Sequence, residues 1–262
     1  MGVEKSFNTL REALSLSAHE HIALVGGGGK TTLMFVLAEE CRKAGKRVIT
    51  STTTKVWHHQ AMKAPYVVYI DSLRPWEDQI GEGLAGVGHV FVGRCVLESG
   101  KVDGISPSLS DDLFDDLEAD YLLVEADGAA GLPVKAPAAH EPVIPASATM
   151  VVAVMGLEAV NSPLSSEVAF RLDETKRITG LATSMPLTPT ALSRLFTHPE
   201  GLFKRAPKRA RRIAFLNKLD LLDSDKDILE LAGVILADPR AKINRVIMGS
   251  IKVGKYRVLG KE

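Results

Sequence analysis

The chain contains eight short apolar runs rich in valine and isoleucine, several of them separated by segments with helical periodicity. The runs occupy residues 21–25, 47–50, 66–70, 89–92, 121–125, 150–155, 213–217 and 245–248. Strands that are apolar at every position are typical of a sheet buried on both faces, and intervening helices favour parallel strands. The pattern predicts an α/β fold: a three-layer sandwich with a mostly parallel sheet and helices on both faces.

The clearest helical pattern follows the first run, over residues 31–44. It places Leu33, Leu37 and Cys41 on one face, and Gly45 is suited to end the helix. We therefore expect Cys41 to pack in the core.

Two segments depart from this alternation. Residues 94–104 contain short extended pieces around Gly100, which predicts a small inserted hairpin. Residues 127–145 carry four prolines without helical period and are typical of a long ordered loop leaving a strand end. We expect one domain over residues 1–262, with the hairpin as its only insertion.

Composition narrows the classes of partner. The 262 residues include 32 basic and 32 acidic side chains, so no overall charge favours nucleic acid or an anionic membrane. The two cysteines lack metal-ligand spacing, and no apolar run is long enough for a signal peptide or a membrane span. These features predict a cytoplasmic protein with a small or specific partner, and they are compatible with an oligomer.

Local charge is less even. Six acids lie between residues 111 and 120, and six bases lie between 204 and 212. Both clusters are typical of solvated faces, with a docking or dimer contact as the alternative. Cys95 is either a thiol nucleophile or ligand or an ordinary surface residue, and the second interpretation is favoured.

The first predicted strand runs into four glycines, a lysine and two threonines at the start of the predicted helix: Gly26, Gly27, Gly28, Gly29, Lys30, Thr31 and Thr32. Glycines let backbone N–H groups converge on a polyphosphate, and a helix start adds unpaired N–H groups and the positive dipole end. Lys30 would neutralise the β- and γ-phosphates, and the Thr31 hydroxyl would coordinate Mg²⁺. The segment predicts a P-loop NTPase-like fold; the alternative is a glycine-rich turn with a surface lysine.

The loop is shorter than the Walker A motif, which would require glycine where Leu24 stands. Written as G-x-x-G-K-T, it resembles the loop of Mur-type peptide ligases. The cradle therefore suits either an ATP-driven ligase or a nucleotide switch.

The predicted strand 121–125 delivers Glu125 and Asp127 to its carboxyl end, followed by Gly128. In an open α/β sheet this end faces the ligand crevice. We expect Glu125 and Asp127 to act with Lys30 in catalysis, by holding Mg²⁺ or orienting the attacking water. Helix caps or turn formers are the alternative. The spacing resembles the E-x-x-G of metal-delivery GTPases that mature hydrogenases and ureases.

Asn217, Lys218 and Asp220 form an N-K-x-D sequence directly after the strand 213–217. This resembles the guanine-specificity motif of GTPases, in which the aspartate accepts hydrogen bonds that adenine does not offer. The asparagine would tie this segment to the phosphate loop. A helix-capping aspartate after a buried strand is the alternative.

Thr52, Thr53 and Lys55 follow the second strand and would bind phosphate or a second anion at the same sheet edge. A plain polar loop is the equal alternative. His58 and His59 lack a third ligand at a suitable spacing, so we assign them no metal.

Together these motifs resemble the YqeC family of accessory proteins for selenium-dependent molybdenum hydroxylases. The resemblance rests on the glycine loop, the threonine run 52–55, Glu-Ala-Asp-Gly-Ala at 125–129, Lys-Ala-Pro at 135–137, Glu-Pro-Val-Ile-Pro at 141–145 and Asn-Lys at 217–218. It implies a P-loop fold and a role in maturing or inserting a molybdenum cofactor, together with its selenium, into a client hydroxylase. Lys135, His140 and Glu141 are then candidates for contacting the second substrate or the client, unless the loop is purely structural.

The combined expectation is a magnesium-dependent NTPase that prefers GTP to ATP and acts as a maturation factor. An ATP-dependent transferase or ligase acting on the cofactor, and a non-catalytic nucleotide-binding protein, are the alternatives. No arginine is placed by sequence as a catalytic finger, so slow turnover is expected; Arg94, Arg171 and Arg177 are nominated for that role.

Overall fold

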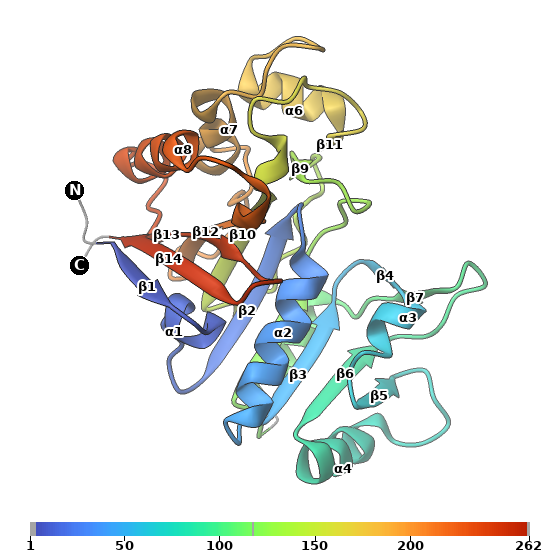
Figure 1. Ribbon diagram of the computed structural model, residues 1–262. Coiled ribbons are helices and arrows are strands. Elements are labelled where there is room, and N and C mark those ends of the chain that lie inside the picture. The colour runs from blue at the N-terminus through green and yellow to red at the C-terminus, as the bar shows by residue number, and fades with distance from the viewer. Residues whose placement is uncertain (1–3, 117, 261–262) are drawn as a thin grey trace.

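A ten-stranded sheet forms the centre of the protein in a computed structural model that describes residues 4–116 and 118–260 (Figure 1). The strand order is β1 (Lys5–Phe7), β14 (Lys255–Gly260), β13 (Arg245–Ser250), β12 (Arg211–Asn217), β10 (Met150–Gly156), β2 (Glu20–Gly26), β8 (Tyr121–Glu125), β3 (Val48–Thr52), β6 (His89–Gly93) and β5 (Tyr66–Tyr69). All neighbours are parallel except β14, which runs antiparallel to β13 and β1. All eight predicted runs are strands of this sheet, so the α/β class with a mostly parallel sheet is confirmed.

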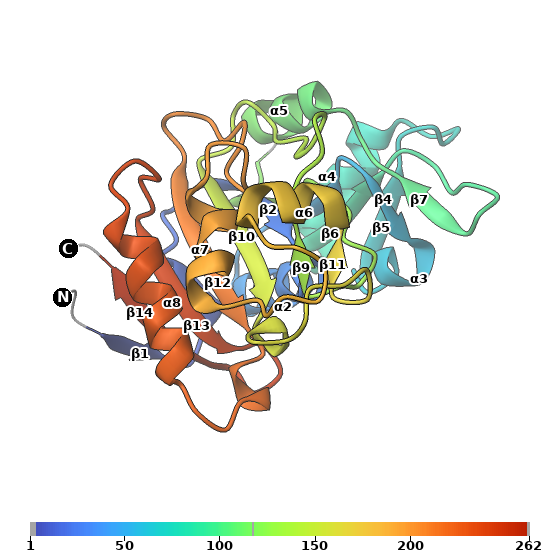
Figure 2. The same ribbon diagram turned by 90° about the horizontal axis from the view of Figure 1, so that it is seen from above.

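Helices cover both faces of the sheet (Figures 1 and 2). One face carries α1 (Leu10–Leu14), α2 (Lys30–Lys43) and α3 (His58–Ala61); the other carries α4 (Trp76–Val87), α5 (Pro107–Asp116), α6 (Leu172–Thr179), α7 (Pro189–Thr197) and α8 (Lys226–Ala237). Successive side chains of a strand point to opposite faces of the sheet, so each strand supplies apolar residues to both helical layers. Ile22 and Leu24 of β2 pack with α2, whereas Ala23 and Val25 pack with the helices of the opposite face. Within the described ranges, no helix has the length and apolarity needed to cross a membrane.

Residue Cys41 lies on the inner face of α2, with no exposed surface. Burial raises the pKa of its thiol to about 12, as expected for a thiol in apolar surroundings. The predicted core position is therefore confirmed.

The predicted hairpin exists within a second, two-stranded sheet. The Val96–Val102 bridge closes the hairpin, and the Gly100 N–H donates to Leu97 O at 2.9 Å. One arm, β7 (Lys101–Asp103), also pairs antiparallel with β4 (Lys55–Trp57). The long loop 127–145 is mostly irregular but includes β9 (Val134–Lys135), which pairs with β11 (Ala169–Phe170).

Two buried histidines make stability sensitive to mild acid. The His21 ring lies between Ser147 Oγ (2.7 Å) and Ser110 Oγ (3.1 Å), and His89 Nε2 lies 3.0 Å from Thr50 Oγ1. Burial lowers the pKa of each histidine to about 4 from 6.5. Between these values the unfolded chain binds more protons than the folded chain, so stability falls as pH decreases.

We expect each histidine to remove on the order of 3 kcal/mol of unfolding free energy between pH 7 and pH 4. Denaturant unfolding at several pH values across this range measures the slope of unfolding free energy against pH. His21→Gln should reduce the slope by roughly half, since one of two shifted histidines is removed. The exposed His59, changed to glutamine, is the control and should leave the slope intact. An unchanged slope in His21→Gln would contradict the assignment.

Candidate functional site

The parallel strands β2, β8, β10 and β12 end at one edge of the sheet, where the predicted motifs meet. Strand β2 continues through Gly26, which pairs with Val154 of β10. Only Gly27, Gly28 and Gly29 then connect the strand to α2, which begins at Lys30. The phosphate cradle expected from the sequence is accordingly a three-residue connection.

The protein's own backbone requires these glycines. A Cβ atom on Gly28, whose φ is +71°, would lie 2.1 Å from the Gly156 nitrogen. The N–H of Gly27 donates to Val154 O and that of Gly28 to Leu132 O, each at 2.9 Å. Of the glycine N–H groups expected to bind phosphate, those of Gly27 and Gly28 are therefore engaged within the protein. The first turn of α2 has no side-chain cap, which leaves its N–H groups without a side-chain partner.

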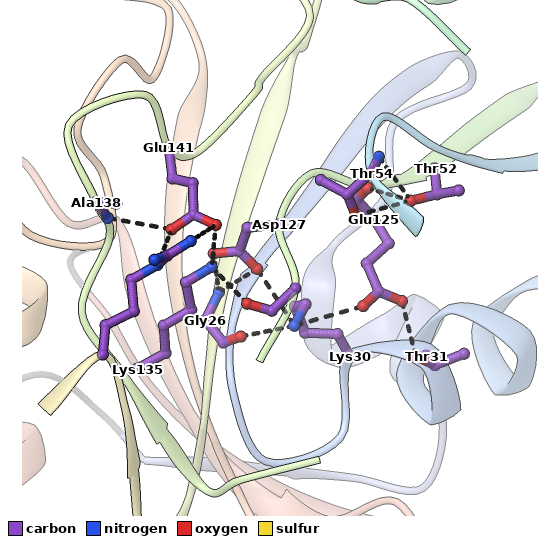
Figure 3. A network of polar contacts seen from close by, with 12 residues as sticks. Gly26, Lys30, Thr31, Thr52, Thr54, Glu125, Asp127, Lys135, Ala138 and Glu141 are labelled. Carbon is purple, nitrogen blue, oxygen red and sulfur yellow. Dashed lines mark hydrogen bonds and ion pairs between the residues drawn. The ribbon is translucent and has the colours of Figure 1, made fainter. Parts of the chain in front are cut away.

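Lys30 lies beside Gly26 of the glycine loop and has only 4% of its surface exposed (Figure 3). Its ammonium donates to Gly26 O at 2.6 Å and lies 3.2 Å from Asp127 Oδ1 and 3.5 Å from Glu125 Oε1. Burial opposes the charged form, but the two carboxylates outweigh it and raise the pKa of Lys30. The lysine is a fixed positive charge at the start of α2.

Glu125 connects the lysine to the helix start. Its Oε2 accepts a hydrogen bond from Thr31 Oγ1 at 2.7 Å, and Glu125 is 6% exposed. Mg²⁺ in proteins is commonly held by one or two carboxylates together with substrate phosphates and water. The adjacent hydroxyl and carboxylate fit that chemistry. No group of three or more acidic, histidine or cysteine ligands occurs within the described ranges, so phosphate oxygens would complete the shell.

The contacts of Asp127 differ from those expected of a magnesium ligand. Both carboxylate oxygens accept from the Gly26 N–H, at 3.1 and 3.0 Å, and the side chain has no exposed surface. Lys30 and Lys135 each lie within 3.3 Å of one oxygen. Because its acceptors are already engaged, the geometry favours a role for Asp127 in fixing the glycine loop.

The charges continue from Asp127 into the long loop (Figure 3). Lys135 Nζ lies 3.0 Å from Glu141 Oε1 and donates to Gly128 O at 2.5 Å. Glu141 in turn accepts from Arg171 Nε at 2.8 Å. Burial alone would raise the pKa of Glu141, but the Arg171 hydrogen bond, the Ala138 N–H and Lys135 together lower it to about 2.

Six side chains thus form a row of alternating charge, here called the charge row: Glu125, Lys30, Asp127, Lys135, Glu141 and Arg171. Lys135 and Glu141, candidates for contacting a client, are buried in this row, whereas His140 is exposed. Their burial favours the structural alternative for these two side chains. The sequence indicated only that Lys135 and Glu141 lie in the long loop after Asp127. Their ion pairs could not be predicted from it.

Asn217 joins the glycine loop as the sequence suggested. Its Nδ2 donates to Gly28 O at 2.8 Å, and its Oδ1 accepts from the Ile251 N–H at 3.2 Å. Lys218 forms an ion pair with Glu158. Asp220 lies exposed in the short helix η2 (Leu219–Leu221). The motif therefore divides into a buried asparagine at the loop and an aspartate facing solvent.

The threonine run lies beside the same edge. Thr52 Oγ1 donates to the backbone oxygen of Glu125 at 3.0 Å, and Thr53 Oγ1 donates to Val143 O at 2.8 Å. Lys55 is exposed on β4, and Thr32 is exposed in the first turn of α2. Thr52 and Thr53 thus stabilise the edge, and Lys55 and Thr32 are available to a ligand.

Two of the remaining nominees are engaged elsewhere. Arg94 pairs with Asp71 and Asp103 beside the hairpin, and Arg171 is committed to Glu141. Cys95 is half-buried next to Arg94. Within the described ranges neither arginine makes a polar contact with Lys30, and the third nominee, Arg177, lines a separate cavity formed by α6 and α7.

Fold and site together define an α/β protein whose candidate site lies at the carboxyl edge of a parallel sheet, between a glycine loop and a carboxylate-bearing strand end. The family model described as "YqeC protein" matches residues 22–173. The chain is 37% identical over 200 residues to a protein of Escherichia coli (strain K12) described as "Uncharacterized protein YqeC", and the alignment covers 75% of each. The chain belongs to the YqeC family, as its motifs predicted.

Proposed function

We propose that the protein is a P-loop NTPase-like, magnesium-dependent nucleotide-binding protein that hydrolyses a nucleoside triphosphate as an accessory factor in molybdenum hydroxylase maturation. The observation that carries the proposal is the contact of Glu125 with both Lys30 and Thr31 at the start of α2. A fixed ammonium, an uncapped helix start and a hydroxyl–carboxylate pair are the groups that a magnesium triphosphate needs.

The proposed chemistry follows from these groups. The N–H groups of the first turn of α2 would bind phosphate oxygens, and Lys30 would balance charge on the transferred phosphoryl group. Thr31 and Glu125 would hold Mg²⁺, which would supply neutralisation of the phosphate charge. To bind the nucleotide, Lys30 would have to turn partly from the Asp127 carboxylate toward a phosphate oxygen. Asp127 would keep the loop in place through the Gly26 N–H.

We infer that GTP is preferred to ATP, a proposal that rests on Asn217 and Asp220. The contact from Asn217 to Gly28 supports it, because this contact joins the segment that would read the base to the segment that would bind phosphate. Exposed Asp220 is available to accept from the guanine N1–H and amino group.

Competition titration of GTP against ATP tests this inference. We expect Asp220→Ala to weaken GTP binding at least tenfold, since a charged hydrogen bond contributes roughly 1.5–3 kcal/mol, and to leave ATP binding unchanged. The matched control is Asp223→Ala, another exposed aspartate close by. A preference for ATP that Asp220→Ala does not alter would refute the guanine assignment.

The maturation role is supported by membership of the YqeC family and by the motif order that resembles metal-delivery GTPases. Nucleotide state would then control delivery of the molybdenum cofactor to its client. Partner-stimulated release of inorganic phosphate is the expected signature. Nucleotide binding with no turnover, even with a client present, would instead favour a non-catalytic binding protein.

A second candidate is an ATP-dependent transferase or ligase acting on the cofactor. The three-glycine connection between β2 and α2 favours it, because it resembles the short loop of ligases more than a full Walker A cradle. Product analysis separates the two functions. Phosphate or nucleotide found on a small molecule would support the transferase, and phosphate found only in solution would support the hydrolase.

A further inference from the structure

A second cavity lies away from the carboxyl edge. It has a volume of about 690 Å³, within the ~300–1,000 Å³ typical of small-molecule sites. Its wall is formed by α6, α7, residues 196–206, residues 238–241 and the first part of β12. Arg212 contributes from the amino end of β12, whereas the glycine loop adjoins the carboxyl ends of its neighbours. The two sites are therefore separate in the fold.

The lining is strongly basic. The cavity is lined by the cationic side chains Arg177, Arg194, Lys204, Arg205, Arg212 and Arg240. Its one acidic lining residue, Asp238, is paired with Arg240 at 2.9 Å, and Lys204 is paired with Glu200. Across residues 4–116 and 118–260, no carboxylate forms an ion pair with any of the other four arginines. Arg177, Arg194, Arg205 and Arg212 therefore carry positive charges outside any ion pair, although Glu200, the partner of Lys204, lies near enough to Arg177 to interact with its charge.

Three of these arginines are fixed by backbone oxygens. Arg194 Nη1 donates to Thr179 O at 2.9 Å, and Arg212 Nη1 donates to Ala241 O at 2.9 Å. Arg205 donates to His140 O and Ala139 O at 2.8 and 3.0 Å. A carbonyl orients a guanidinium without neutralising it, so each arginine keeps its charge and further N–H donors for a ligand.

Burial sharpens the imbalance at Arg212, which is partly enclosed and whose guanidinium lies 5.8 Å from the Phe203 ring centroid. Burial lowers the pKa of this arginine, because no anion offsets the loss of water. An anion in the cavity would remove that cost. Arginine forks match phosphate oxygens in a bidentate manner, which favours phosphate over a monovalent anion.

We propose that this basic cavity binds a phosphate-bearing small molecule with two or more negative charges. The volume of the cavity, about 690 Å³, is that of a small-molecule site, whereas a nucleic-acid backbone would follow a longer basic groove. The proposal is independent of the nucleotide proposed for the glycine loop. It concerns binding alone.

Calorimetric titration of the full chain with inorganic pyrophosphate tests the proposal. A background variant, Lys30→Met, removes the lysine of the glycine loop and should retain the cavity's binding. We expect Arg177→Gln and Arg194→Gln each to weaken binding about tenfold, the equivalent of one charged hydrogen bond. Both side chains are exposed, so the fold should survive, and thermal melting checks this.

The matched control is Lys208→Gln. It removes an exposed lysine from the basic run 204–212 that does not line the cavity. Its effect should stay below twofold, as expected for a surface charge. Three results would overturn the proposal: no pyrophosphate binding at millimolar concentration, equal weakening by Lys208→Gln, or binding that disappears with Lys30→Met and persists in both arginine variants.

Discussion

Replacing Lys30 with methionine is expected to abolish nucleotide hydrolysis, with a loss of about 10²–10³-fold or more in turnover. Methionine keeps most of the length of the side chain but removes the ammonium group that faces Glu125 and Asp127. Those two carboxylates would then oppose the incoming phosphate. Hydrolysis and equilibrium binding of magnesium GTP measure the effect.

Lys43→Met is the matched control, because Lys43 lies on the same helix with a largely exposed side chain. It should leave binding and hydrolysis within twofold of wild type, as is usual for surface charges. If Lys30→Met unfolds, Thr31→Val tests the same site by removing only the hydroxyl that touches Glu125. Undiminished hydrolysis in a folded Lys30→Met protein would contradict the proposed chemistry.

The second large effect is expected on stability, from Lys135→Met in the charge row. Lys135 has essentially no exposed surface and lies between Asp127 and Glu141. Its removal leaves two buried carboxylates without their shared cation, which typically costs about 3–5 kcal/mol of unfolding free energy. Denaturant unfolding at pH 7 measures this loss. Lys176→Met, which removes a partly exposed lysine paired with the exposed Asp173, should cost less than about 1 kcal/mol.

The same variant has a predictable pH dependence. In the wild type Glu141 titrates near 2 rather than 4.5, so its stabilising charge is lost as pH falls through that interval. In Lys135→Met the pKa of Glu141 should rise. The variant therefore lacks much of the stabilisation by ionised Glu141 already at neutral pH. The stability difference between wild type and Lys135→Met should therefore narrow below pH 4.5. A constant difference across the acid range would show that electrostatics is not the cause.

The sheet could be predicted from the sequence because its central strands are buried on both faces and are therefore rich in apolar residues. β1, β4, β9, β11 and β14 were not predicted. Four of them, β1, β4, β9 and β11, have only two or three residues, and β14, which lies between β1 and β13, is only partly buried. Pairing of such strands depends on neighbours distant in sequence, which leaves little local signal.

The site was predicted in part for a similar reason. Lys30, Thr31 and Glu125 follow strands whose ends meet at one edge, so topology alone brings them together. The engagement of Gly28 by Leu132, and of Asp127 by Gly26, depends on how the loop 127–145 folds back. No local pattern encodes that path.

The basic cluster at 204–212 shows the same limit. As a run in the sequence it is typical of a solvated face, and Lys208 and Arg209 are indeed exposed. Arg205 and Arg212, however, turn toward arginines of α6 and α7 to line the cavity. The sequence shows which residues are basic, but it does not show which of them lie together in the folded protein.

Equilibrium titration of the wild-type chain with GTP and with ATP, with and without Mg²⁺, decides whether the protein is a magnesium-dependent nucleotide-binding protein, as proposed. On this proposal, GTP binding is saturable and magnesium-dependent, is eliminated by Lys30→Met and is preserved by Lys43→Met. Failure of the folded wild-type protein to bind either nucleotide at millimolar concentration in the presence of Mg²⁺ would contradict it.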